Sequence, residues 1–279
     1  MAISKIIIKI ANVLALFFLL GVNIYSGLGP DNESHYTKNH ITYISPAYFT
    51  FYVWFLIHLL LIGFVIYQFF LEAPRDEAIT KDIHWHFVGV ALLNTLWLAL
   101  WNDDLLLLSW ITIFVVVCQV TYIYHALYNR YTFESPPPSW LENLFIKFPF
   151  TLYHAWIVVV AVLTTYAVIT PEKTYQTANT TNTTNATSTT TTYGSEEPNI
   201  IVQIAVIIGL IILESTVITY IELREDWAGG AVIAWTLYGI WYEQEDPVIH
   251  WTALVLAVTA TIYLFKPLVV KYIKDKEPF

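Results

Sequence analysis

Long apolar segments occur eight times along this chain, and they limit what it can fold into. A helix needs roughly 20 mostly apolar residues to cross the hydrocarbon core of a bilayer. The segments comprise residues 6–26, 46–71, 85–101, 105–128, 144–170, 200–221, 227–242 and 248–270. With 57% hydrophobic and 13% charged residues, the chain has too little polar surface for a water-soluble fold. We therefore predict an all-α, polytopic membrane bundle of about eight transmembrane helices, forming one domain over residues 1–279.

The number of spans depends on two of these segments. Residues 85–101 and 227–242 are short and carry several polar or small side chains, so seven or six spans are the alternatives to eight. The first segment follows a basic start, as in a secretory signal, but its apolar stretch is long for one, and we interpret it as a retained signal anchor. The single cysteine, Cys118, can form no intrachain disulfide.

Charges and glycosylation sequons predict the same orientation. With the N-terminus in the cytoplasm, the connections on that side and the tail hold most of the basic residues between and after the spans: Arg75, Lys81, Arg130, Arg224, Lys271, Lys274 and Lys276. The opposite connections hold the N-x-S/T sequons at Asn32, Asn179, Asn182 and Asn185. Both signals place the N- and C-termini in the cytoplasm. Use of the sequons would make the chain a glycoprotein of the endomembrane system or the plasma membrane.

Residues 171–199 form a connection rich in asparagine and threonine. Such a tract buries too little apolar surface to fold alone, which predicts a solvated, disordered exterior loop. The alternative is a sugar-bearing projection. The net charge of −9 comes largely from acidic connections and leaves no basic patch, which argues against a nucleic-acid partner.

Polar residues inside the spans are candidate functional residues, because an unpaired polar group in lipid is costly. Glu214 lies near the middle of the sixth segment, and Gln203 precedes it by about three helical turns, so the two share a face. One interpretation is a proton or cation site, or an anchor for a ligand. The other, which we weight more heavily, is a pair of hydrogen bonds to a neighbouring helix.

Histidines within the spans or at their ends raise the question of haem ligation. They are His58, His125, His154 and His250. No C-x-x-C-H motif and no recurrent two-helix spacing accompanies them, so we favour hydrogen-bonded packing residues over haem ligands. His84 and His86 alternate around Trp85 and cannot share a helical face, which favours an interfacial role over metal binding. We find no paired-carboxylate, nucleophile–base, zinc or phosphate-loop pattern, and we predict a protein that is not an enzyme and has no metal site.

Aromatic residues recur at helical spacing in three segments. Asn94, Trp97 and Trp101 form one stripe, and Trp235, Tyr238 and Tyr242 repeat its spacing. In the fifth segment, Tyr153 and Trp156 share a face with Pro149. Trp97, Trp156 and Trp235 lie deeper in their segments than an interfacial belt requires. Buried indoles with an asparagine and a few tyrosine hydroxyls suit a flat, mostly apolar ligand.

Four short stretches carry a resemblance to a known family: PAYFTFYVW (residues 46–54), LNTLW (93–97), PFTLYHAW (149–156) and AWTLYGI (234–240). In these stretches the chain resembles the tryptophan-rich sensory proteins, relatives of the translocator protein (peripheral benzodiazepine receptor), in a longer eight-span branch. The resemblance implies a helical membrane fold with a pocket for porphyrins, sterols or other flat hydrophobic molecules. It implies pocket residues at Pro46, Phe49, Trp54, Asn94, Trp97 and Trp156, to which the aromatic stripe adds Trp235 and Tyr238.

The chain also departs from the family pattern. Where relatives commonly have a glycine before the tryptophan, this chain has His154 and Ala155, and the stretch around Trp54 lacks the usual Trp-Gly pair. Bulkier side chains there would narrow a pocket. Since Pro46 begins its segment at the outer surface and Pro149 at the inner one, Trp54 and Trp156 should approach from opposite leaflets. We expect an outward-facing pocket or none.

Two functions follow from these features. The first is a protein that binds or moves a tetrapyrrole, sterol or lipid between its helices, with membrane lipids and a hydrophobic small molecule as partners and no obligatory cofactor. The second is a structural or scaffold membrane protein whose exterior loop, residues 171–199, contacts neighbouring subunits of a homo-oligomer or a membrane complex.

Overall fold

A computed structural model describes residues 2–28, 40–71, 75–133, 137–173, 175–179, 191–195 and 197–274. In these ranges, each of the eight predicted segments forms a helix. The helices are α1 (Ala2–Leu28), α3 (Tyr52–Tyr67), α4 (His86–Asn102), α5 (Leu106–Phe133), α7 (Phe148–Ile169), α8 (Ile200–Arg224), α9 (Trp227–Glu243) and α10 (Pro247–Leu264). The predicted polytopic helical bundle is therefore confirmed.

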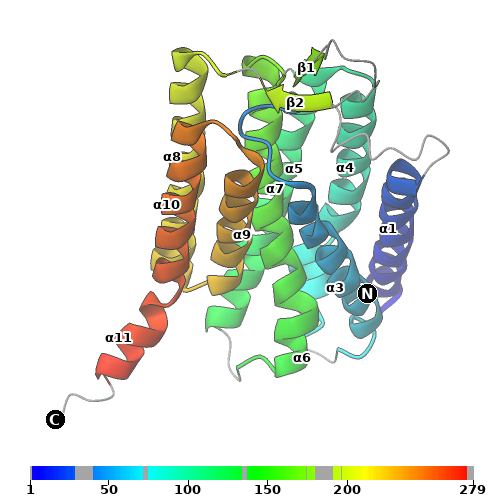
Figure 1. Cartoon of the computed structure of the whole chain (residues 1–279). Helices are drawn as coiled ribbons and strands as arrows, with labels where there is room; N and C mark the ends of the chain where they lie inside the picture. Colours follow the sequence, from blue (N-terminus) through cyan, green and yellow to red (C-terminus); the bar gives the residue numbers. More distant parts are fainter. Residues whose placement is uncertain are drawn as a thin grey trace.

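Shorter elements join these helices. A 3₁₀-helix, η1 (Tyr48–Phe51), leads into α3, and a π-helix, η2 (Ala78–Ile83), precedes α4. The short α6 (Trp140–Glu142) and a second π-helix, η3 (Asn143–Lys147), precede α7, while α11 (Lys266–Lys274) follows α10 at an angle (Figure 1).

Six helical segments in the described ranges are long and apolar enough to cross a membrane. The remaining two helices, α4 and α9, have 17 residues each, which is about 26 Å of helix against a hydrocarbon core of about 30 Å. These are the two segments that the sequence marked as short.

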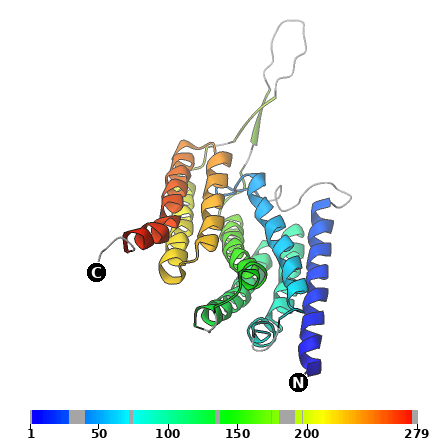
Figure 2. The same cartoon turned by 90° about the horizontal axis from the view of Figure 1, so that it is seen from below.

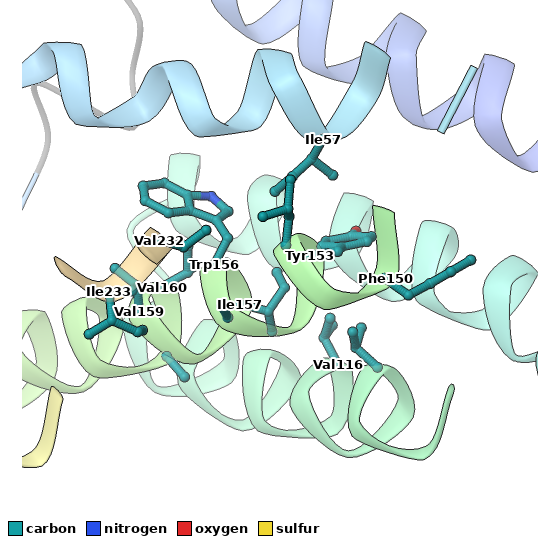
Figure 3. Packing of buried hydrophobic residues seen from close by; sticks show 14 of the residues in the cluster. Ile57, Val116, Phe150, Tyr153, Trp156, Ile157, Val159, Val160, Val232 and Ile233 are labelled. Atoms are coloured by element: carbon teal, nitrogen blue, oxygen red, sulfur yellow. The ribbon is translucent and has the colours of Figure 1, made fainter. Parts of the chain in front are cut away.

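The helix at the centre of the bundle is α7. It packs against α3, α5 and α9, whereas α4 packs against α1 and α5, and α8, α9 and α10 pack on one another (Figure 1). Figure 3 shows Ile57 of α3, Val116 of α5 and Val232 of α9 around the side chains of α7. Phe150, Tyr153 and other residues along all faces of α7 are buried, so this helix forms the core.

Local sequence signals explain where several helices begin. Ser139 and Glu142 form a capping box, in which the Glu142 backbone N–H donates to Ser139 Oγ and the Ser139 N–H donates to the Glu142 carboxylate. Asn199 caps α8, and Asp226 and Asp246 cap α9 and α10 in the same way. Pro149 lies just after the wider π-turns of η3, at the point where α7 begins within the unbroken helical segment Trp140–Ile169.

The two ends of the described chain lie at one end of the bundle, which we call the inner end because the charge pattern predicts it to face the cytoplasm (Figure 1). A hairpin of β1 (Tyr175–Asn179) and β2 (Thr191–Ser195), paired antiparallel, lies at the opposite, outer end and stands clear of the helices (Figure 2). The connection 171–199 is therefore partly ordered, in contrast to the disordered loop we expected. Threonine and tyrosine favour extended backbone, and both strands contain them. Asn32, Asn182, Asn185 and the side chain of Asn179 lie outside the described residues.

Ion pairs and amide hydrogen bonds fasten α1 to the rest of the inner end. Asp76 lies 2.6 Å from Lys9 Nζ and 2.9 Å from Lys5 Nζ, and it is nearly buried. Burial by itself raises the pKa of Asp76, but the ammonium groups of Lys9 and Lys5 lower it by more than burial raises it. The pKa of Asp76 is therefore below its usual value. One turn further along α1, Asn12 donates to the buried Gln68 at 3.1 Å.

Candidate functional site

Aromatic residues of η1, α3 and α7 meet in one cluster. The ring centroid of Trp54 lies 5.7 Å from that of Tyr153 and 6.2 Å from that of Trp156, and Phe51 lies 5.5 Å from Trp156. Trp54 and Trp156, which we expected to approach from opposite leaflets, are in direct ring contact. Tyr153 and Trp156 are fully buried, and their rings lie on the side of α7 that faces Ile57 of α3 (Figure 3). These rings fill the space between α3 and α7.

Three buried polar atoms of this cluster have no hydrogen-bond partner among the described residues: His58 Nε2, Tyr153 Oη and Trp156 Nε1. His58 Nδ1 lies 2.7 Å from the carbonyl oxygen of Trp54. Because a carbonyl only accepts, Nδ1 carries the proton and Nε2 is an acceptor. The cluster therefore offers two donors and one acceptor, and such buried groups usually have partners.

The proline-aromatic start of the second segment contacts α9. The Ala47 N–H donates to the carbonyl of Gly239 at 3.0 Å, directly after the buried Pro46. The ring of Phe49 packs edge-to-face on Trp235 at 5.3 Å and on Tyr242 at 5.5 Å. Phe49 and Trp235 thus belong to a second aromatic group, at the outer end of α9.

An apolar groove of about 530 Å³ runs between α3, α7 and α9. Its walls are almost entirely apolar or aromatic and come from Tyr52, Val53, Leu56, Leu60, Leu144, Phe148, Leu152, Trp227, Ala228, Ala231, Val232 and Trp235. The small side chains of Ala228 and Ala231 leave this space on the surface of α9. Several wall residues are open to the surrounding bilayer, including Tyr52 at 62% and Trp227 at 56% exposure.

Two expectations about the pocket are wrong. Trp235, which we expected to be buried, is 42% exposed and lines the groove. The groove also reaches the inner end, where Phe148 and Trp227 begin α7 and α9, so it is not confined to the outer half. His154 does not narrow the groove, because its side chain lies against Tyr124 of α5 and Tyr220 of α8.

The remaining residues implied for the pocket lie elsewhere. Asn94 and Trp97 are buried in α4, which packs on α1 and α5, and neither lines the groove. The carbonyl of Trp97 accepts from Ser109 Oγ at 3.5 Å, whereas the amide of Asn94 has no hydrogen-bond partner in the described part of the chain. Tyr238 accepts from Thr261 of α10 at 3.2 Å. The structure therefore does not bring the predicted ligand-binding residues into a single site.

Gln203 and Glu214 form the stripe predicted for them, and it faces α10. Gln203 Nε2 donates to Asp246 Oδ2 at 2.9 Å, and Thr259 Oγ1 donates to Glu214 Oε1 at 3.1 Å. The geometry matches the alternative of hydrogen bonds to a neighbouring helix. The histidines are hydrogen-bonded too: His125 with Arg224 at 2.7 Å and His250 with Trp241 at 2.9 Å.

A buried polar network that we did not predict surrounds Asp226. Its Oδ2 accepts from Tyr124 at 2.9 Å and from Thr151 at 3.2 Å, while its Oδ1 accepts from the first backbone N–H groups of α9. Beside it, His154 stacks on Tyr124 at 4.6 Å and bonds the Tyr220 hydroxyl and Thr121. An aspartate directly before Trp-Ala-Gly-Gly was a readable helix-capping signal, but its partners come from α5 and α7. In the ranges described, no group of three or more histidine, cysteine or acidic side chains is arranged to hold a metal ion.

Comparison with known proteins gives one match. A family model described as TSPO-like protein matches residues 9–266 of this chain. No curated protein and no solved structure matches it. The matched range includes every residue that lines the groove between α3, α7 and α9.

Proposed function

This chain belongs to the TSPO-like protein family, and as an integral, multi-pass membrane protein of that family we propose that it binds a flat hydrophobic ligand between α3, α7 and α9. The observation that carries the proposal is the apolar groove there, with an indole at each end. Beside it lies a buried aromatic cluster with three polar atoms that have no hydrogen-bond partner within the described part of the chain. A volume of about 530 Å³ falls within the usual range for small-molecule sites.

The walls and the polar atoms suggest the chemistry of the ligand. A flat ring system would stack against Trp227, Trp235 and Tyr52, which bury large apolar areas with little loss of side-chain entropy. Where the ligand displaces one of the rings between α3 and α7, a carboxylate or carbonyl on its edge would accept hydrogen bonds from Tyr153 and Trp156. A tetrapyrrole carries such groups, and it is our first candidate. A sterol, whose single hydroxyl would pair with His58 or Tyr153, is the second.

The exposure of the groove suggests how a ligand would enter. Tyr52, Leu56, Trp227 and Trp235 are all at least 42% exposed on the surface that the bilayer covers. A hydrophobic molecule dissolved in lipid would therefore enter sideways, without crossing water. We propose binding or transfer of the ligand within the membrane, and no catalytic step.

Tryptophan fluorescence tests this proposal. Protoporphyrin IX added to the detergent-solubilised protein should quench the emission saturably, and Ala231→Leu, which fills the groove, should weaken the apparent affinity by tenfold or more. Ala11→Leu, at a half-buried position on α1 outside the groove, should leave the affinity unchanged. Equal quenching of both variants and of the wild type would refute the groove as the site.

Tyr153→Phe separates the polar cluster from the groove. The change removes one unpartnered hydroxyl without altering the ring packing. Weaker binding of protoporphyrin IX with unchanged binding of its apolar, carboxylate-free analogue would support a role for the cluster. An equal effect on both ligands would contradict it.

A scaffold role remains the second proposal, and the hairpin favours it. Because β1 and β2 stand clear of the helices (Figure 2), their strand edges are open to pairing with a neighbouring molecule. Replacing residues 174–196 with a short Gly-Ser linker should then abolish oligomers seen by cross-linking in membranes while leaving porphyrin quenching intact. Unchanged cross-linking would count against this role.

A further inference from the structure

A second cavity, separate from the groove, lies at the inner end. It has a volume of about 570 Å³ and lies between the first turns of α1 and the π-helix η2. Its lining from α1 is Ser4, Lys5, Ile7 and Ile8, and from the other side Glu77, Thr80, Lys81, His84 and Trp85. No residue of this cavity lines the groove between α3, α7 and α9.

Around this cavity the ammonium groups of Lys5, Lys9 and Lys81 meet two carboxylates, those of Asp76 and Glu77, which leaves one positive charge in excess. Lys5 is paired with Asp76 at 2.9 Å, and Lys81 is paired with Glu77 at 2.8 Å. Lys81 holds the pKa of Glu77 below its usual value, so Glu77 remains ionised at neutral pH. Each ammonium group has three N–H donors, and its ion pair uses only part of them. Both lysines therefore keep donors for an anion, and Lys81 is 63% exposed at its side chain.

The backbone around this cavity is unusual in two respects. Residues 78–83 form a π-helix, a form that is rare and occurs frequently at functional sites. The residue that follows, His84, has φ 43° and ψ −134°, a conformation that costs energy in a residue with a Cβ atom. This turn brings His84 and Trp85 into the cavity lining together with Glu77 and Lys81.

The cavity spans a polar region at the membrane surface and an apolar region inside the bilayer. Its polar part lies at the start of α1, whereas Ile7 and Ile8 continue toward the apolar middle of that helix, and Ile7 is 49% exposed. Trp85 is 46% exposed beside it, and tryptophan is enriched at the boundary between lipid and water. A ligand that fits has an anionic end for the lysines and an apolar end that remains in the bilayer.

We propose that this cavity binds the phosphate headgroup of an anionic phospholipid from the inner leaflet. Lys5 and Lys81 donate to the phosphate, Ser4 and Thr80 face the glycerol, and an acyl chain lies along Ile7 and Ile8. Glu77 and Asp76 orient Lys81 and Lys5 in the empty site. When Lys5 turns to the phosphate, Asp76 remains paired with Lys9.

Native mass spectrometry of the full-length protein in mild detergent, with added phosphatidylglycerol or phosphatidylcholine, tests the proposal. The wild type should retain phosphatidylglycerol at least tenfold more tightly than phosphatidylcholine. Lys81→Gln should weaken the binding of phosphatidylglycerol by about fivefold. The double variant Lys5→Gln/Lys81→Gln should weaken it by about 30-fold, since each lysine near a membrane surface contributes a similar free energy to the binding of an anionic lipid. A normal thermal unfolding midpoint for each variant confirms that it is folded.

Lys266→Gln is the matched control. Lys266 is also an exposed lysine that pairs with a glutamate, Glu222, near the inner end, but it lies outside the cavity. Equal losses of lipid from Lys81→Gln and Lys266→Gln would overturn the proposal, because they would show nonspecific attraction to the basic inner face. Equal retention of the two lipids would overturn it as well. Glycerol 3-phosphate that binds as tightly as phosphatidylglycerol would assign the cavity to a soluble phosphate ester instead.

Discussion

Replacing Gly239 with alanine should weaken the contact between η1 and α9. A Cβ atom at Gly239 would lie 1.9 Å from Thr50 Oγ1 and 3.3 Å from Pro46 Cβ. Thr50 is fully buried and β-branched, so it cannot move aside by rotating a flexible chain. Overpacking of a core costs about 1–3 kcal/mol, and we expect the upper part of that range here. Alanine regains about 1 kcal/mol of helix propensity, which leaves a net loss of about 2 kcal/mol.

The free energy of unfolding can be measured by titrating the protein with SDS in mild detergent and following tryptophan emission. Gly89→Ala is the control, since among the described residues no atom outside the nearby backbone of α4 lies within 4 Å of the position its Cβ would take. That variant should gain up to about 1 kcal/mol. Adding Thr50→Ala to Gly239→Ala should restore much of the loss, which a double-mutant cycle would detect as coupling. If Gly239→Ala were as stable as Gly89→Ala, the close approach of η1 to α9 would be refuted.

Two further predictions concern buried carboxylates. Asp226→Ala should cost about 3 kcal/mol, because it removes a helix cap and leaves Tyr124 and Thr151 without their acceptor. Asp246→Ala, which removes a more exposed cap, should cost about 1 kcal/mol; similar losses measured by the same SDS titration would contradict the buried network. The contribution of Asp76 should be complete above the usual aspartate pKa of 3.8 and decline as the pH falls below it, because its pKa is lowered in the folded protein. Asp76→Asn should therefore flatten the acid limb of a plot of thermal midpoint against pH below about pH 4, and an unchanged limb would show that other groups control acid stability.

The number and order of the helices could be predicted from the sequence. Continuous apolar length is what a bilayer demands of a spanning helix, and this signal is local. Each apolar segment became a helix, and the segments that were marked as short, 85–101 and 227–242, are the two 17-residue helices.

The faces of these helices could not be predicted in the same way. Trp156 is fully buried and Trp235 is 42% exposed, although both lie deep in apolar segments. In water, an apolar side chain indicates a buried face, but a bilayer solvates apolar side chains as well, so the periodicity no longer separates core from surface. The family resemblance grouped Trp54 and Trp156 with Asn94 and Trp97, which the structure places on a different helix, α4.

Pairing between distant residues was also beyond the reach of the sequence. Lys5 and Asp76 are 71 positions apart, and Tyr124 and Asp226 are 102 positions apart. Each is an ordinary charged or polar residue when read alone. The cavity between α1 and η2 depends on such a pairing and on a π-helix that no local sequence pattern predicted.

The packing of α9 against α7 affects how the protein is made. Helices enter the membrane in chain order, so α3 and α7 are inserted before the ribosome has synthesised α9. Until then, lipid covers the surfaces of Leu56, Leu152 and their neighbours that later form two walls of the groove. The third wall is formed by α9, which is synthesised only within the last quarter of the chain. A translation product that stops before Trp227 would therefore have most of its helices inserted but no site to occupy.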